Sequence, residues 1–141
     1  MQIRPYKCVY LNYQSLEDWT KACDILRCNS DFHSEPRNDC AILNIDSKHL
    51  ICVRIRGLFK CSILSREQFD IALVQVFRPS SWKPFTVWDG CQVYDEVKEL
   101  KFILVESLVR GALMVPTFDG PSGKFYFDDV VDYDMFLRAG N

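Results

Sequence analysis

The chain has 141 residues and a formal net charge of −2, with 48% hydrophobic and 26% charged residues. This length fits one domain of roughly 100–200 residues, and the composition is typical of a globular protein whose core needs no disulfide staples. The net charge excludes a strongly basic protein that binds nucleic acid through its overall electrostatic field.

The cysteine pattern indicates a reducing environment. The seven cysteines are odd in number and form no Cys-x-x-Cys pair. Cys40, Cys52 and Cys61 fall in apolar runs, where a free thiol behaves as a small hydrophobic group. We therefore expect an intracellular protein, nuclear or cytoplasmic, rather than a disulfide framework. We also expect neither a secretory signal nor a membrane partner, because no apolar segment approaches the ~20 residues that span a bilayer.

The first part of the chain predicts an extended arm followed by a helix. Ser15 has the features of a helix N-cap, and acidic residues follow it in the first turn. Four apolar residues then recur at helical spacing: Leu16, Trp19, Cys23 and Leu26. We expect residues 1–38 to form this arm and helix, with a polar loop at 29–39, packed on a β-barrel body at 39–141.

The body at 39–141 predicts strands throughout, at 40–45, 50–59, 69–77, 92–96, 100–105, 108–115 and 124–131. Gly57 is a candidate bulge or bend, and a helical turn at 132–137 closes the domain with Met135 and Phe136 buried. No crossover helices separate the strands, which favours a barrel or sandwich. The predicted fold is mainly β: one small β-barrel or sandwich of about eight strands, with one N-terminal helix and a short C-terminal helical turn.

The connection that follows the 69–77 strand carries the strongest binding signal. It holds three evenly spaced aromatic residues, with an acidic and an aromatic neighbour: Trp82, Phe85, Trp88, Asp89 and Tyr94. Aromatic rings on a barrel loop can form a cage for a methylated lysine, held by cation–π attraction of ~1–2 kcal/mol. Packing of such rings on the barrel is the more frequent role. The preferred functional prediction is a non-catalytic module that binds a protein or peptide segment, with chromatin as one source of that segment.

Two alternatives stay open. Arg54, Arg56 and Lys60 lie on or near one strand face and could contact phosphates, as in a nucleic-acid accessory domain of a mobile element. Cys91 follows a predicted exposed turn and could be the nucleophile of a cysteine-dependent enzyme, with His33 or His49 as its base.

Motifs for metals and catalysis are missing from the sequence. Zinc ligands would require Cys/His pairs, and the acidic run at 128–134 lacks the Gly and the terminal Glu of a calcium loop. The sequence has no G-x-S-x-G motif, P-loop or G-x-G-x-x-G motif. We expect no metal, no cofactor and no catalytic residue, and we interpret the acidic run as a solvated edge.

Four runs carry a resemblance to other proteins: Arg78-Pro79-Ser80-Ser81-Trp82, Trp88-Asp89-Gly90-Cys91, Val109-Arg110-Gly111-Ala112-Leu113 and residues 132–141. Through them, residues 37–141 resemble uncharacterised proteins of mushroom-forming fungi, encoded beside or within transposon-like genes. That group implies no activity. The strand layout is also similar, more weakly, to bromo-adjacent-homology and tudor-like barrels. Those barrels are non-catalytic readers of chromatin or of partner proteins, and the similarity implies such a role for the aromatic connection.

Overall fold

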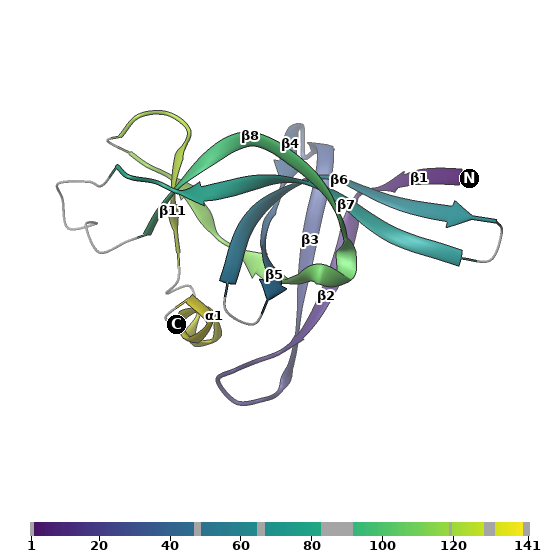
Figure 1. Cartoon of the computed structure of the whole chain (residues 1–141), viewed down its shortest axis with the longest axis horizontal. Helices are drawn as coiled ribbons and strands as arrows, with labels where there is room; N and C mark the ends of the chain where they lie inside the picture. Colours follow the sequence, from purple (N-terminus) through teal and green to yellow (C-terminus); the bar gives the residue numbers. More distant parts are fainter. Residues whose placement is uncertain are drawn as a thin grey trace.

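The structure is a computed structural model that describes residues 2–46, 49–64, 67–82, 92–118, 120–128 and 132–139, with backbone alone at 45, 46, 49 and 133. It is mainly β, and its strands form an eight-stranded and a three-stranded sheet (Figure 1). Among the described residues, no helix has the length and apolar character needed to cross a membrane.

The larger sheet contains β1 (Gln2–Tyr6), β5 (Cys40–Asp46), β6 (His49–Ile63), β7 (Glu67–Pro79), β8 (Gln92–Leu104), β9 (Leu108–Ala112), β10 (Met114–Pro116) and β11 (Lys124–Phe127). Its hydrogen-bonded order is β10-β11-β8-β7-β6-β5-β9, and β1 pairs with the outer half of β6. Strands β9 and β10 stand at opposite ends of this order, although only Leu113 separates them in the chain. The sheet therefore curls almost into a barrel, which confirms the predicted mainly β class.

The smaller sheet contains β2 (Cys8–Gln14), β3 (Lys21–Phe32) and β4 (Glu35–Asn38), in that order. The hairpin of β2 and β3 crosses the larger sheet, as Figure 1 shows. Leu11 of β2 and Leu26 of β3 are buried in the core that this crossing closes. The short helix α1 (Tyr133–Ala139) lies at the other end of the molecule from β1 (Figure 1).

The predicted N-terminal helix is wrong. Strand β3 replaces it and pairs with β2 from Cys8↔Arg27 to Gln14↔Lys21. The residues that suggested a cap form tight turns instead. Ser15 Oγ accepts a hydrogen bond from Glu17 N at 3.2 Å, and Asp18 Oδ1 accepts one from Thr20 N at 3.0 Å. Such side-chain bonds two residues ahead compete with helix formation, and cross-strand pairing then outweighs helix propensity.

Exposure also contradicts the predicted helical face. Of its four residues, Leu26 is buried, whereas Trp19 and Cys23 are exposed. The polar loop predicted at 29–39 is largely the β3–β4 hairpin, whose turn places His33 and Ser34 at positive φ. The N-terminal arm and the residues after it therefore build strands of both sheets.

Other boundaries differ in detail. The strands predicted at 92–96 and 100–105 are the single strand β8, and the one predicted at 108–115 is divided into β9 and β10. The β6–β7 register shifts between Ile55 and Gly57, which confirms the bulge. The closing helical turn is confirmed as α1. Met135 is fully buried as predicted, but Phe136 is about half exposed (48%).

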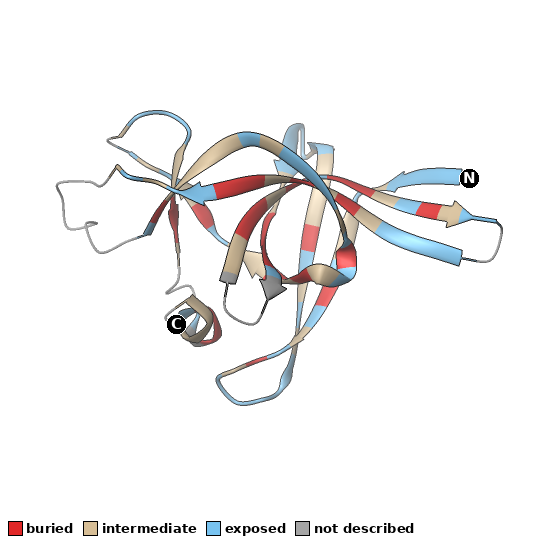
Figure 2. Ribbon diagram, in the orientation of Figure 1, coloured by how far each residue is buried: buried red, intermediate tan, exposed pale blue. Residues whose placement is uncertain are grey.

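The central residues of β5 and β6, 40–43 and 52–55, are largely buried on both faces of the sheet (Figure 2). On one face, Val53 and Ile55 pack with the Leu11 and Leu26 side chains of the crossing hairpin. On the other face, Cys52 belongs to a second cluster that also contains Phe77, Phe127 and Met135 of α1. The alternation along β6 thus separates two cores, one closed by the hairpin and one closed by α1.

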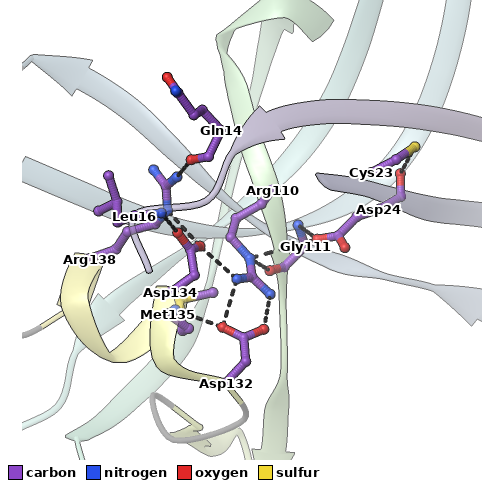
Figure 3. A network of polar contacts seen from close by, with 10 residues as sticks. All are labelled: Gln14, Leu16, Cys23, Asp24, Arg110, Gly111, Asp132, Asp134, Met135 and Arg138. Carbon is purple, nitrogen blue, oxygen red and sulfur yellow. Dashed lines mark hydrogen bonds and ion pairs between the residues drawn. The ribbon is translucent and has the colours of Figure 1, made fainter. Parts of the chain in front are cut away.

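A polar network fixes α1 against the sheets (Figure 3). Arg110 of β9 donates from Nη1 and Nη2 to the two carboxylate oxygens of Asp132, at 2.9 and 2.8 Å. Its Nη1 also donates to Asp134 Oδ2 at 2.8 Å. Arg138 binds the same Asp134 oxygen at 2.8 Å and donates to the Gln14 carbonyl at 2.8 Å. The network therefore joins β2, β9 and the C-terminal helix.

Candidate functional site

A hollow of about 690 Å³ opens where β2, the first residues of β7 and the end of β8 come together. Its volume lies within the roughly 300–1,000 Å³ range of ligand sites. The lining residues come from three separate parts of the sequence: Tyr10, Leu11, Asn12, Gln68, Phe69, Asp70, Leu104, Val105, Glu106 and Leu108. We define this surface as the β2–β7 hollow.

The hollow exists because β8 stops short of the end of β7. The last pair between these strands is Ile71↔Leu104, and the 3-10 turn η2 (Val105–Ser107) then leads the chain away. In the part of the chain that the structure describes, residues 67–70 pair only with β6, and β2 pairs only with β3. Two open strand edges therefore border the hollow, and such edges are ready templates for another strand.

The β2–β7 hollow is acidic. Asp70 and Glu106 line it with exposed carboxylates, and none of its described lining residues is basic. Lys60 on β6 is the register partner of Asp70, and its Nζ lies 5.5 Å from the centre of the Tyr6 ring. Burial and the negative charge of Asp70 raise the pKa of Tyr6 to about 12. With the exposed Tyr10 ring also present, the hollow suits a positively charged group.

The aromatic connection is only partly within the described residues. Phe85, Trp88 and Asp89 lie outside them. Trp82 is half-buried and packs on Gly120, where an added Cβ would lie 2.6 Å from the Trp82 Cη2 atom. The Tyr94 ring packs edge-on against Phe127 at 6.0 Å between centres, and its hydroxyl donates to Gln92 Oε1 at 3.1 Å. Both described rings have packing roles, and the five-residue cage stays a prediction.

The three basic residues of the nucleic-acid hypothesis are not brought together. Arg54 and Arg56 share Glu96, whose two carboxylate oxygens lie 3.2 and 2.6 Å from their Nη2 atoms. The register shift at Gly57 changes which face each later residue of β6 occupies. Arg54 lies opposite Gln75 and Lys60 lies opposite Asp70, so these two side chains occupy opposite faces.

The described thiols and histidines form no catalytic pair. Cys91 and the His49 side chain lie outside the described residues, and His33 is exposed at the β3–β4 turn. Burial raises the pKa of Cys40 to about 11 and that of Cys52 to about 12, which makes them poor nucleophiles. Within the described ranges, no group of three or more His, Cys, Asp or Glu side chains could hold a metal ion. Asp132 and Asp134 of the acidic run bind Arg110 instead.

Comparisons with models of protein families, with curated proteins and with solved structures found no match. The candidate site therefore depends on the geometry of this chain alone. The residues that sequence reasoning missed are Tyr10, Asp70 and Glu106. The sequence predicts a strand at 69–77, but no local feature of the sequence indicates that residue 70 lies beside residue 10.

Proposed function

We propose that the chain is a non-catalytic interaction module that binds an extended protein segment with a basic side chain in the β2–β7 hollow. The observation that carries this proposal is the combination of two carboxylates, Asp70 and Glu106, with two open strand edges around one hollow. A pocket that offers both charge and unpaired backbone suits a polypeptide better than a small molecule.

The segment binds by strand addition. Its main chain pairs with the open edge of β7 at residues 67–70, which supplies affinity without regard to sequence. Alternate side chains of an extended segment point to the same side, so one of them enters the hollow. A lysine or arginine there places its charge near Asp70 and Glu106 and its aliphatic stem along Tyr10.

Lysine-rich histone tails have this chemistry, and a chromatin-linked partner remains one form of the proposal. The aromatic connection, with Trp82 and Tyr94 as its described members, is then a second candidate site for a methylated lysine. The nucleic-acid alternative has weaker support, because the Arg54 and Arg56 guanidinium groups are already joined by Glu96.

The test is a fluorescence-anisotropy titration with labelled ten-residue peptides that carry a central lysine, trimethyl-lysine, arginine or glutamate. We expect the basic peptides to bind and the glutamate peptide not to bind. The double variant Asp70→Asn/Glu106→Gln should weaken binding by roughly 10–30-fold, about 1 kcal/mol for each exposed charge. A peptide with proline at alternate positions should also lose affinity, because strand addition needs its N–H groups.

The matched control is Asp31→Asn/Glu35→Gln, which removes two exposed carboxylates from the β3–β4 hairpin region. It should bind as the parent does. The proposal fails if no basic peptide binds more tightly than millimolar, or if the control weakens binding as much as the test variant. Binding that is lost on Trp82→Ala but kept in the Asp70/Glu106 variant would instead move the site to the aromatic connection.

A further inference from the structure

A second surface, which meets the β2–β7 hollow at Phe69 and Leu104, is apolar and uncovered. The strand registers place Ile3, Cys61 and Phe69 in one row and Ile71 beside Leu104 in the next. Leu73 opposite Phe102 and Gln75 opposite Leu100 continue the same face. We define this face of β1, β6, β7 and β8 as the apolar sheet face. Figure 2 shows exposed, pale blue stretches on β1, β7 and β8, the strands that contribute these residues.

The apolar sheet face is large for a surface that stays in water. Phe102, near its centre, is 70% exposed. Six of its residues are each more than a third exposed: Ile3, Ile63, Phe69, Leu100, Phe102 and Leu104. Together they expose the equivalent of about three whole apolar side chains, roughly 500–600 Å². The largest patch on a monomer is typically ~300–600 Å². The half-buried Phe59, Ile71 and Leu73 beside them bring the face close to the ~800 Å² that each partner buries in a standard interface.

Among the described residues of this face, the charged side chains lie at its two ends. Glu67 lies at the β6–β7 tip, opposite Ile63. At the other end, two arginines share one glutamate, so the cluster of Arg54, Arg56 and Glu96 keeps a net charge of +1. The rows between them are uncharged.

We propose that the apolar sheet face docks on the same face of a second copy of this chain. The two-fold axis lies in the plane of the interface, perpendicular to the strands, and passes over the centre of the face, so Phe102 and Leu73 of both copies come together. It also sets the acidic end of each copy, at Glu67, against the basic end of the other, at Arg56. The face is thus complementary to itself in charge as well as in area, and two sheets can stack at ~10 Å with their apolar side chains interdigitated.

The test is the mass in solution, measured by light scattering after size exclusion and by sedimentation velocity. The chain has a mass of 16.5 kDa, and we expect the parent to have twice this mass at about 100 µM and to dissociate on dilution. Phe102→Asp should weaken dimerisation at least tenfold, because each copy then buries a carboxylate at the centre of the interface. The matched control is Phe118→Asp, since Phe118 is 78% exposed on the β10–β11 connection, away from the face. It should leave the dimer intact.

A charge variant tests the two-fold arrangement itself. Glu67→Lys places a cation against the basic end of the second copy and should weaken the dimer at low salt more than at high salt. A parent that stays monomeric at about 100 µM overturns the proposal, as does a dimer that survives Phe102→Asp or is lost equally in Phe118→Asp. Circular dichroism of each variant verifies folding. Phe102 and Phe118 do not line the β2–β7 hollow, so the masses of these two variants test the dimer separately from peptide binding. Glu67 belongs to the β7 edge, and its variant is therefore used only to measure the salt dependence of the dimer.

Discussion

Arg110 and Asp134 form a buried ion pair in which Nη1 lies 2.8 Å from Oδ2 and the two side chains are 6% and 5% exposed. The pair joins β9 to the C-terminal helix, and Asp134 also accepts a hydrogen bond from Leu16 N at 2.6 Å. Burial alone would lower the pKa of Arg110, but hydrogen bonds to Asp132 and Asp134 raise it above its ordinary value. The guanidinium therefore stays charged and holds two carboxylates in place.

Replacing Arg110 with methionine should destabilise the fold strongly. Methionine keeps the length and apolar stem of the side chain but leaves Asp132 and Asp134 without their shared cation. Removing one partner of a buried pair costs about 3–5 kcal/mol when the remaining charge is left unpaired. Arg138 still binds Asp134 in this variant, so we expect a loss near the lower end, about 3 kcal/mol. Urea unfolding followed by circular dichroism measures this loss.

The matched control is Arg37→Met, which breaks an ion pair with Asp39 in which the arginine side chain is 43% exposed. Exposed pairs contribute about 0–1 kcal/mol, so this variant should unfold close to the parent. Arg110→Lys should fall between the two, because an ammonium keeps the charge without the two-pronged contact to Asp132. Equal losses for Arg110→Met and Arg37→Met would contradict a dominant role for the buried network.

The same network predicts acid sensitivity. Hydrogen bonds from Arg110 lower the pKa of Asp132. Burial raises the pKa of Asp134, but hydrogen bonds from Arg138, Leu16 N and Arg110 outweigh it, and the net pKa is lowered. A carboxyl whose pKa is lower in the folded state than in the unfolded state stabilises the fold at pH values above its unfolded-state pKa, about 4. This stability is lost as the pH falls toward the folded-state pKa. The free energy of unfolding should thus decline steadily below about pH 4.

Asp134→Asn separates this contribution from general acid unfolding. The variant should be less stable than the parent at pH 7 and should show a shallower decline in free energy of unfolding between pH 5 and 3. Denaturant titrations at a series of pH values provide both slopes. Identical slopes in parent and variant would mean that Asp134 does not couple proton binding to folding.

Sequence reasoning succeeded where local pattern controls structure. The strand predicted at 50–59 is part of β6, where Val53 and Ile55 alternate with Cys52 between two cores, and Gly57 marked its bulge. It failed at Ser15 and Asp18, because their side chains form tight turns as readily as helix caps. Only the pairing of β3 with β2 decides between these structures.

The candidate site was less accessible to prediction than the fold. Tyr10 and Asp70 are far apart in the sequence, and their approach follows from the crossing of the β2–β3 hairpin over the larger sheet. The apolar sheet face was equally hard to predict, because three strand pairings have to be known before Ile3, Phe69 and Phe102 can be placed on one face. Side-chain identity predicts strands, but long-range pairing places their faces together.

Replacing Gly120 with any larger residue should destabilise the fold while Trp82 is present. An added Cβ would lie 2.6 Å from Trp82 Cη2 and 2.8 Å from its Cζ2 atom, so Gly120→Ala must displace the indole. We expect a loss of about 1–3 kcal/mol in unfolding free energy, as for other overpacked sites, with increased acrylamide quenching of tryptophan fluorescence. In a Trp82→Ala background the same substitution should cost far less, since the clash is gone. Additive losses in the double variant would mean that the two residues do not touch.

Thiol labelling tests the interpretation of the cysteines. Cys23 is exposed, whereas Cys40 and Cys52 are buried with pKa values raised to about 11 and about 12. At pH 8 a thiol with so high a pKa is almost entirely protonated, and the thiolate is the reactive form. Peptide mapping after brief iodoacetamide treatment should therefore find Cys23 modified and Cys40 and Cys52 unmodified until the protein is unfolded in urea. Rapid modification of Cys52 in the folded protein would mean that the core around Met135 opens far more readily than its packing indicates.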